Sequence, residues 1–114
     1  MSDDRRKYPR VKVSIHIEWG LTRACEFYTD RITSLSLGGC FIQTEQPGAR
    51  GDTLYVRLWN SPESGGVLEG RVAYQLNVAE EKPPIGFGVQ FVGLTEYDVQ
   101  NLKHLLEFYS EKAT

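Results

Sequence analysis

The sequence predicts an all-β domain, a six-stranded antiparallel β-barrel followed by one C-terminal helix. Three observations predict this class. Apolar and polar residues alternate in several stretches between residues 11 and 92, which is the period of a half-buried strand. The loops between these stretches carry Gly and Pro, as hairpin connections require. Near the C-terminus the apolar period becomes helical. Because no helix separates the strands, an antiparallel sheet is expected, and closure into a barrel removes its exposed edges.

The first two strands lie before the segment SLSLGG. In VKVSIHIEW, residues 11–19, every odd position is apolar and every even position is polar, so this segment is predicted to be a half-buried strand. A less regular stretch over residues 24–34 leads into SLSLGG, residues 34–39. The two glycines, Gly38 and Gly39, predict a turn there.

Three further strands complete the region before the final strand. They are expected over residues 40–44, 53–59 and 67–76, separated by the loops EQPGARGD and NSPESGG. The residues expected on inner faces are Leu54, Val56 and Leu58 in the fourth strand and Leu68, Val72 and Tyr74 in the fifth.

The last strand and the helix close the chain. GFGVQF lies at the centre of a strand over residues 85–92, with its apolar side chains in alternation. Thr95 and Asp98 are spaced as in a capping box, which marks a helix start. A helical stripe follows, formed by Val99, Leu102, Leu106 and Tyr109. With 114 residues the chain is long enough for one domain with its own core. We therefore expect a single domain over 1–114, with a flexible basic tether over 1–10, the barrel over 11–92 and the helix over 95–110.

The bulk composition excludes several classes of protein. Lys and Arg number 13 against 15 Asp and Glu, whereas a general nucleic-acid binder usually carries a basic face. No apolar run reaches the roughly 20 residues of a membrane span, and the polar N-terminus lacks a signal-peptide core. These features predict a cytoplasmic protein with neither DNA nor RNA as its partner and with no membrane insertion.

No catalytic or metal site can be identified from the sequence. Cys25 and Cys40 are separated by 14 residues, and the chain has only two histidines, His16 and His104, which makes a poor set of metal ligands. The cysteines are interpreted as buried or idle thiols. GARGD, residues 48–52, lacks the Lys-Ser/Thr ending of a phosphate-binding loop, so it is interpreted as a turn. We expect no enzyme, no metal and no cofactor.

Two segments depart from simple strand patterning. RRKYPR, residues 5–10, holds four cations, and its proline disfavours a helix. Guanidinium groups match phosphate oxygens, chelate the O6 and N7 edge of guanine and stack on bases. In SLSLGG the hydroxyls of Ser34 and Ser36, together with the backbone N–H groups around Gly38 and Gly39, can donate to an anion. A purine nucleotide would satisfy both segments.

Together the two segments resemble the PilZ domain family, bacterial receptors for cyclic di-GMP. RKYPR, residues 6–10, matches the RxxxR motif of that family, and SLSLGG stands where the family has (D/N)xSxxG. The resemblance extends to the first strand, to GRVAY and GFGVQF, and to the closing helix, so it covers nearly the whole chain. It implies the family fold, a six-stranded antiparallel barrel with that helix.

The resemblance also implies a ligand site. Arg6 and Arg10 would grip guanine and phosphate groups of cyclic di-GMP, with Arg5 adding charge. Ser36 would bind a phosphate or a nearby polar atom, and Gly39, beside Gly38, would keep the surface flat. Ser34 departs from the family, because a hydroxyl cannot make the two-point contact to guanine that a carboxylate makes. Losing one such contact would weaken binding roughly tenfold to a hundredfold.

The leading hypothesis is a cyclic di-GMP-responsive adaptor. The tether would close over the nucleotide and change the interaction with a protein partner that controls motility, attachment or biofilm formation. One alternative is a protein-interaction module of the same fold that binds no nucleotide because of Ser34. Another is a small barrel that binds single-stranded nucleic acid through Tyr8, Tyr55 and Trp59, which the acidic balance disfavours. Both a monomer and a homodimer are compatible with the sequence.

Overall fold

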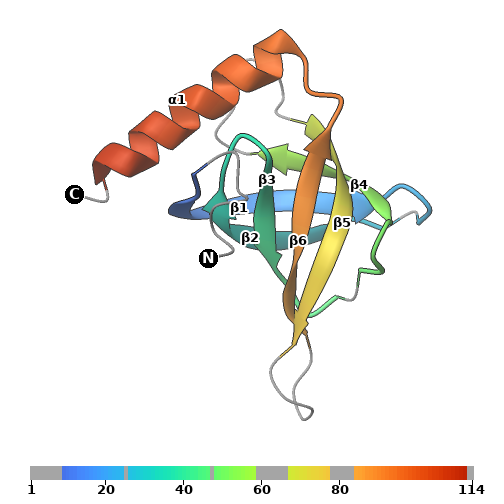
Figure 1. Ribbon diagram of the computed structural model, residues 1–114. Coiled ribbons are helices and arrows are strands. Elements are labelled where there is room, and N and C mark those ends of the chain that lie inside the picture. The colour runs from blue at the N-terminus through green and yellow to red at the C-terminus, as the bar shows by residue number, and fades with distance from the viewer. Residues whose placement is uncertain (1–8, 25, 47, 59–66, 78–83, 113–114) are drawn as a thin grey trace.

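The protein folds as a closed six-stranded antiparallel barrel with one helix (Figure 1). The computed structural model describes residues 9–24, 26–46, 48–58, 67–77 and 84–112. The elements are β1 (Val11–Leu21), β2 (Tyr28–Leu35), β3 (Gly39–Gln43), β4 (Thr53–Leu58), β5 (Val67–Asn77), β6 (Pro84–Val92) and α1 (Glu96–Lys112). Around the barrel the strands follow the order β1-β2-β3-β6-β5-β4, and β4 pairs with β1. The predicted fold class is confirmed.

The core forms where the alternating side chains of the strands point inward. In β1 the predicted inner face is confirmed, since Val13, Ile15, Ile17 and Trp19 are all buried. Trp19 is the largest fully buried side chain of the described residues. Its indole Nε1 donates to Asp30 Oδ2 at 2.9 Å, and its ring meets Phe87 edge-on with centroids 5.1 Å apart. The one polar atom of this aromatic side chain therefore has a partner, as burial demands.

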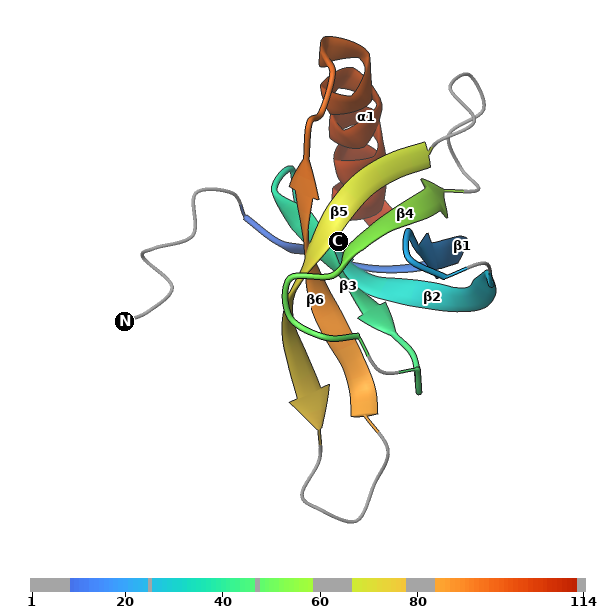
Figure 2. The same ribbon diagram turned by 90° about the vertical axis from the view of Figure 1, so that its right-hand side faces the viewer.

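The helix begins at the predicted capping box. The Thr95 amide donates to Asp98 Oδ2, and the Asp98 amide donates to Thr95 Oγ1, each at 3.0 Å. Leu102 and Leu105 on α1 are buried in the same core cluster as the barrel residues. Figures 1 and 2 both show α1 lying beside the barrel, near the turn between β2 and β3. Among the described residues, no helix combines the length and the apolar character needed to cross a bilayer.

Three details of the sequence prediction are corrected by the structure. β1 continues past Trp19 to Leu21, because Gly20 and Leu21 pair with β4. The stripe expected on the helix omitted Leu105, which is only 7% exposed. Tyr74, expected on the inner face of β5, is 39% exposed.

A β-bulge explains the outward position of Tyr74. In the pairing of β5 with β6, Val72 lies opposite Val89, whereas Tyr74 lies opposite Gly88. Two steps along β5 therefore match one step along β6, and Ala73 is the extra residue. An extra residue shifts the alternation of every following side chain, so Tyr74 is turned from the core to the surface.

Candidate functional site

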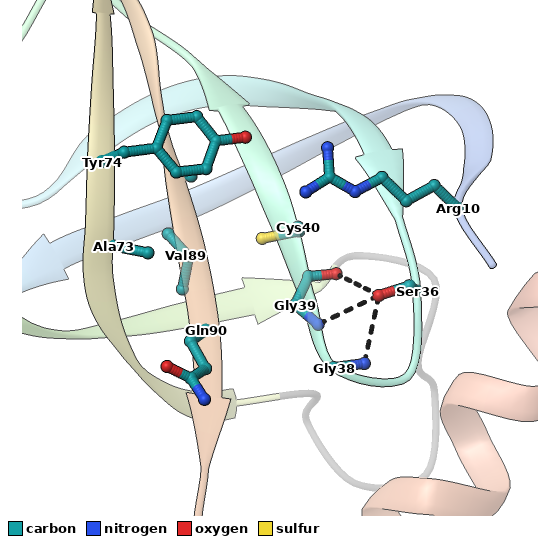
Figure 3. Close-up of a pocket in the computed structure, with 10 residues that line it drawn as sticks. Arg10, Ser36, Gly38, Gly39, Cys40, Ala73, Tyr74, Val89 and Gln90 are labelled. Atoms are coloured by element: carbon teal, nitrogen blue, oxygen red, sulfur yellow. Dashed lines mark hydrogen bonds between the residues drawn. The ribbon is translucent and has the colours of Figure 1, made fainter. Parts of the chain in front are cut away.

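A pocket with a volume of about 320 Å³ opens where the β2–β3 turn meets β5 and β6 (Figure 3). Ser36, Gly38 and Gly39 line it from the turn, and Arg10 lines it from the residue preceding β1. From β3, β5 and β6 the lining residues are Cys40, Ala73, Tyr74, Gly88, Val89 and Gln90. Four separate parts of the chain therefore build one concave surface.

Arg10 brings a positive charge to this pocket. It is exposed and stands immediately before β1. Figure 3 shows its guanidinium reaching across the turn toward the hydroxyl of Tyr74. Neither of the two ion pairs found among the described residues includes Arg10. Its planar fork of donors is therefore available to an anionic ligand.

Ser36 holds the β2–β3 turn together from within. Its Oγ accepts hydrogen bonds from the amides of Gly38, at 3.1 Å, and Gly39, at 3.2 Å, and donates to the Gly39 carbonyl at 3.4 Å. The Ser36 amide donates to the same carbonyl at 2.9 Å. From the sequence, these glycine amides were expected to donate to a bound anion. In the structure they donate to Ser36 instead, so this hydroxyl sets the shape of the turn.

Gly39 is required by the approach of β3 to β6. A Cβ at this position would lie 2.0 Å from the carbonyl oxygen of Val89, far inside van der Waals contact. From the sequence this glycine was related to the approach of a ligand. The structure adds a constraint from the pairing of β3 with β6, since a side chain at Gly39 would push the two strands apart.

An aromatic surface forms one wall of the pocket. The ring of Tyr74 lies over Gly88, where an added Cβ would be 2.2 Å from Cε1 of the tyrosine. The ring of Phe41 lies beside it, with centroids 6.3 Å apart. Cross-strand pairing places Ser34, Phe41, Gly88 and Tyr74 in one line across β2, β3, β6 and β5. Since Tyr74 is partly exposed, its ring can stack against a planar ligand.

The remaining polar groups of the pocket are the thiol of Cys40 and the amide of Gln90. Cys40 is buried, and desolvation raises the pKa of its thiol to about 12. The thiol is therefore protonated at neutral pH and is a poor nucleophile. Within the described residues, no three side chains of His, Cys, Asp or Glu gather as metal ligands would. Gln90 lines the opposite side of the pocket from Arg10 and offers an amide that both donates and accepts (Figure 3).

The structure brings together four of the seven predicted site residues, namely Arg10, Ser36, Gly38 and Gly39. Ser34 does not line the pocket; it is half-buried and pairs with Lys12 and Phe41. Arg5 and Arg6 lie outside the described residues, as do Tyr8, Cys25 and Trp59.

Sequence reasoning missed Tyr74 and Gln90 as lining residues. The only signal for Tyr74 was the imperfect alternation of its strand, since a tyrosine that breaks the apolar pattern can mark a bulge. Gln90 gave no signal, because a polar residue on the outer face of a strand is ordinary.

Comparison with known proteins finds one family. Residues 4–108 match the PilZ domain. No curated protein matches the chain. Solved structures of several other proteins share its fold.

The PilZ domain of YcgR from Escherichia coli with cyclic di-GMP shares 17% identity at a TM-score of 0.70, covering 96% of this chain and 94% of the other. MotI/DgrA, the inhibitor of motility of Bacillus subtilis, shares 15% identity at a TM-score of 0.71. The match covers 96% of this chain and 51% of that chain. The MrkH–cyclic di-GMP complex of K. pneumonia shares 18% identity at a TM-score of 0.74. The match covers 96% of this chain and 54% of that chain. The chain therefore spans nearly all of the YcgR domain but about half of the other two chains.

Proposed function

This chain belongs to the PilZ domain family, and from that premise we propose that it is a receptor for cyclic di-GMP. The YcgR and MrkH structures that share its fold contain this nucleotide. The observation that carries the proposal is the meeting of Arg10, the β2–β3 turn and Tyr74 at one pocket. These groups offer a cation for phosphate, a rigid polar turn and a ring for a base.

The arginines supply the charge in this proposal. Cyclic di-GMP carries two phosphodiesters, and guanidinium groups bind phosphate and the guanine edge through charge-assisted hydrogen bonds. Arg10 stands at the pocket with an exposed guanidinium. Arg5 and Arg6 precede it by five and four residues, close enough to reach the same ligand. Residues 5–10 thus close over the nucleotide when it binds.

The barrel supplies shape and stacking. Tyr74 stacks on a guanine, and Gln90 donates or accepts at its edge. Ser36 holds Gly38 and Gly39 in the conformation that faces the ligand, and adds a polar contact. Ser34 stands outside the pocket lining, in the cross-strand row that ends at Tyr74. From there it offers the base a single hydroxyl where a carboxylate would make two contacts, which weakens binding roughly tenfold to a hundredfold.

The nucleotide acts as a signal in this proposal, with no chemical step. Binding orders the basic segment against the barrel and changes the surface presented to a protein partner. We assign the output to the control of motility or attachment, in the cytoplasm. If Ser34 prevents binding altogether, the same fold serves as a protein-interaction module without a nucleotide.

Isothermal titration with cyclic di-GMP tests the proposal. The unmodified chain is expected to give saturable heat. Arg10→Ala should weaken binding by roughly 10- to 150-fold, as expected for the loss of a hydrogen bond to a charged group worth about 1.5–3 kcal/mol. Tyr74→Ala should weaken it by loss of stacking. Ser34→Asp should tighten it, because the carboxylate restores the second contact to guanine.

Arg57→Ala is the matched control for these titrations. It removes the same side chain from β4, which contributes no residue to the pocket, so the affinity should be unchanged. Absence of both heat and thermal stabilisation at high micromolar nucleotide would refute the receptor function and leave the interaction module. Equal loss of affinity in Arg57→Ala and Arg10→Ala would refute the assignment of this pocket.

A further inference from the structure

A second exposed surface lies on the outer face of β1 and β4. We call it the β1–β4 patch; it consists of Glu18, Phe27, Tyr55, Arg57 and Val67, which line a depression of about 260 Å³. Phe27 is 74% exposed, Tyr55 44% and Val67 46%. None of the five lines the pocket assigned to the nucleotide. A cluster of large, solvent-exposed apolar side chains of this kind marks an interaction surface.

Strand pairing arranges this patch as two opposed couples. Glu18 on β1 lies directly opposite Arg57 on β4, with Oε1 and Nη1 3.9 Å apart. Two residues further along β1, Gly20 lies opposite Tyr55. The ring of Phe27 covers Gly20, since an added Cβ there would be 2.8 Å from Cδ1 of the phenylalanine. An acid on β1 thus lies opposite a base on β4, and the ring of Phe27, from the residue before β2, covers β1 opposite Tyr55 on β4.

This arrangement is self-complementary under a two-fold axis. The axis lies in the interface and runs between β1 and β4, parallel to them, so it places β1 of one copy over β4 of the other. Glu18 then faces the Arg57 of the second copy, and Phe27 faces its Tyr55. Both couples form twice, as the isologous contact of a C2 dimer requires. We propose that the β1–β4 patch binds a second copy of this chain.

The charges favour a second copy over an unrelated protein. Within one copy the Glu18–Arg57 pair is long and both side chains are more than a third exposed, so it contributes little by itself. In the dimer each of these charges gains a second opposite neighbour while the rings exclude water. Binding to an unrelated partner would not require that one two-fold axis bring Glu18 over Arg57 and also bring Phe27 over Tyr55.

The expected association is weak. The patch has five residues, whereas a stable interface buries about 800 Å² on each partner. Sedimentation equilibrium of the full chain without nucleotide, from about 10 µM to about 1 mM, should therefore show a mass that rises with concentration from 12.9 kDa toward twice that value. A mass that stays at 12.9 kDa over this range overturns the proposal. This outcome is independent of nucleotide binding.

Charge reversal tests the two-fold geometry. Glu18→Arg gives a patch with two cations, and Arg57→Glu gives one with two acids. Each variant alone should associate at least about tenfold more weakly than the unmodified chain, because like charges then face each other. An equimolar mixture of the two should recover association, since every cation of one variant meets an acid of the other.

Reversals on the helix are the matched controls. Lys103→Glu and Glu107→Arg change exposed charges on α1, away from the patch, and should leave association unchanged. Circular dichroism of each variant verifies that the barrel is folded. A mixture of Glu18→Arg and Arg57→Glu that remains monomeric while the unmodified chain dimerises overturns the two-fold arrangement, as does unchanged association of either variant alone.

Discussion

At the scale of single residues, Ser36 shows how one hydroxyl shapes the wall of the pocket. Its Oγ accepts from two consecutive amides and is largely buried. A buried amide without an acceptor destabilises a fold by about 1–3 kcal/mol. The side chain therefore stabilises the turn in the chain without ligand, and a turn held in this way lowers the ordering cost of the proposed binding.

Ser36→Ala should lower the free energy of unfolding by about 1–3 kcal/mol, because the amides of Gly38 and Gly39 lose their acceptor. Urea denaturation measures this change. Ser34→Ala is the control, since it removes a hydroxyl two residues earlier that makes no side-chain hydrogen bond within the described residues. It should change stability by less than about 0.5 kcal/mol. Equal effects of the two variants would contradict the assigned role of Ser36.

Gly39→Ala should destabilise the barrel by about 1–3 kcal/mol through overpacking. The added methyl would stand 2.0 Å from the carbonyl oxygen of Val89, and this atom belongs to the backbone of β6, so it cannot rotate away. Ser14→Ala, an exposed change on β1, is the control in the same urea experiment. A Gly39→Ala variant as stable as the unmodified chain would show that β3 and β6 can separate without cost.

At the scale of elements, the start of α1 depends on two reciprocal hydrogen bonds. Thr95 and Asp98 each accept from the other's amide, and the Val99 amide donates to the Thr95 carbonyl at 3.0 Å. Acidic residues in the first turn, Glu96 and Asp98, also match the positive end of the helix dipole. The helix boundary is thus set locally.

Thr95→Ala should lower the free energy of unfolding by about 0.5–2 kcal/mol, because the Asp98 amide then lacks its side-chain acceptor. Thermal unfolding followed by circular dichroism measures the loss. Thr95→Ser keeps the hydroxyl and should retain most of the stability. If Thr95→Ser loses as much as Thr95→Ala, the methyl group rather than the hydrogen bond is responsible.

A salt bridge joins the loop after β1 to the loop before β4. Arg23 donates to both oxygens of Asp52 at 3.0 and 3.1 Å, and the Ala49 amide donates to Asp52 Oδ2. The hydrogen bond from Arg23 is the main cause that lowers the pKa of Asp52 below its ordinary 3.8. The ionised carboxylate therefore stabilises the fold above that value, and this contribution is lost as the pH falls through the lower, folded-state pKa.

Asp52→Asn should accordingly be less stable than the unmodified chain at neutral pH, and the difference should shrink as the pH falls below 3.8. Urea denaturation over a pH series measures it. Arg23→Gln removes the same bridge from its other end and should show the same trend. A difference that is constant across the series would mean that ionisation of Asp52 does not contribute.

At the scale of the whole molecule, the closed barrel separates two surfaces. The pocket proposed for the nucleotide lies over the β2–β3 turn, β5 and β6, whereas the β1–β4 patch lies over the strands that close the barrel. No residue belongs to both. Nucleotide binding and self-association can therefore be measured separately.

Cyclic di-GMP should raise the melting temperature of the whole barrel, because a ligand that binds only the native state stabilises it. At a concentration about 100 times the dissociation constant this amounts to about 2.7 kcal/mol. Differential scanning fluorimetry with increasing nucleotide measures the shift, and GMP at equal concentration is the control. A similar shift with GMP would indicate a general anion effect, and Arg10→Ala should reduce the shift with cyclic di-GMP.

The sequence predicted the fold class, the family and the order of the elements. Its strand patterns were accurate where each strand follows an uninterrupted period of two, as in β1 and β4. For the site, RRKYPR and SLSLGG indicated Arg10, Ser36, Gly38 and Gly39, which the structure gathers at one pocket. The SLSLGG motif did not reveal that Ser36 Oγ is the acceptor for the glycine amides. Residue types alone do not determine which partner a hydroxyl group hydrogen-bonds.

What the sequence determined by itself is local: periodicity, turn residues and the capping box depend on neighbours along the chain. What only the tertiary structure decided is which residues face each other across strands. The bulge at Ala73 depends on how β5 pairs with β6, and it turned Tyr74 toward the pocket. The pairing of Glu18 with Arg57 likewise depends on β4 closing against β1. Register is set by partners distant in sequence, so no local pattern encodes it.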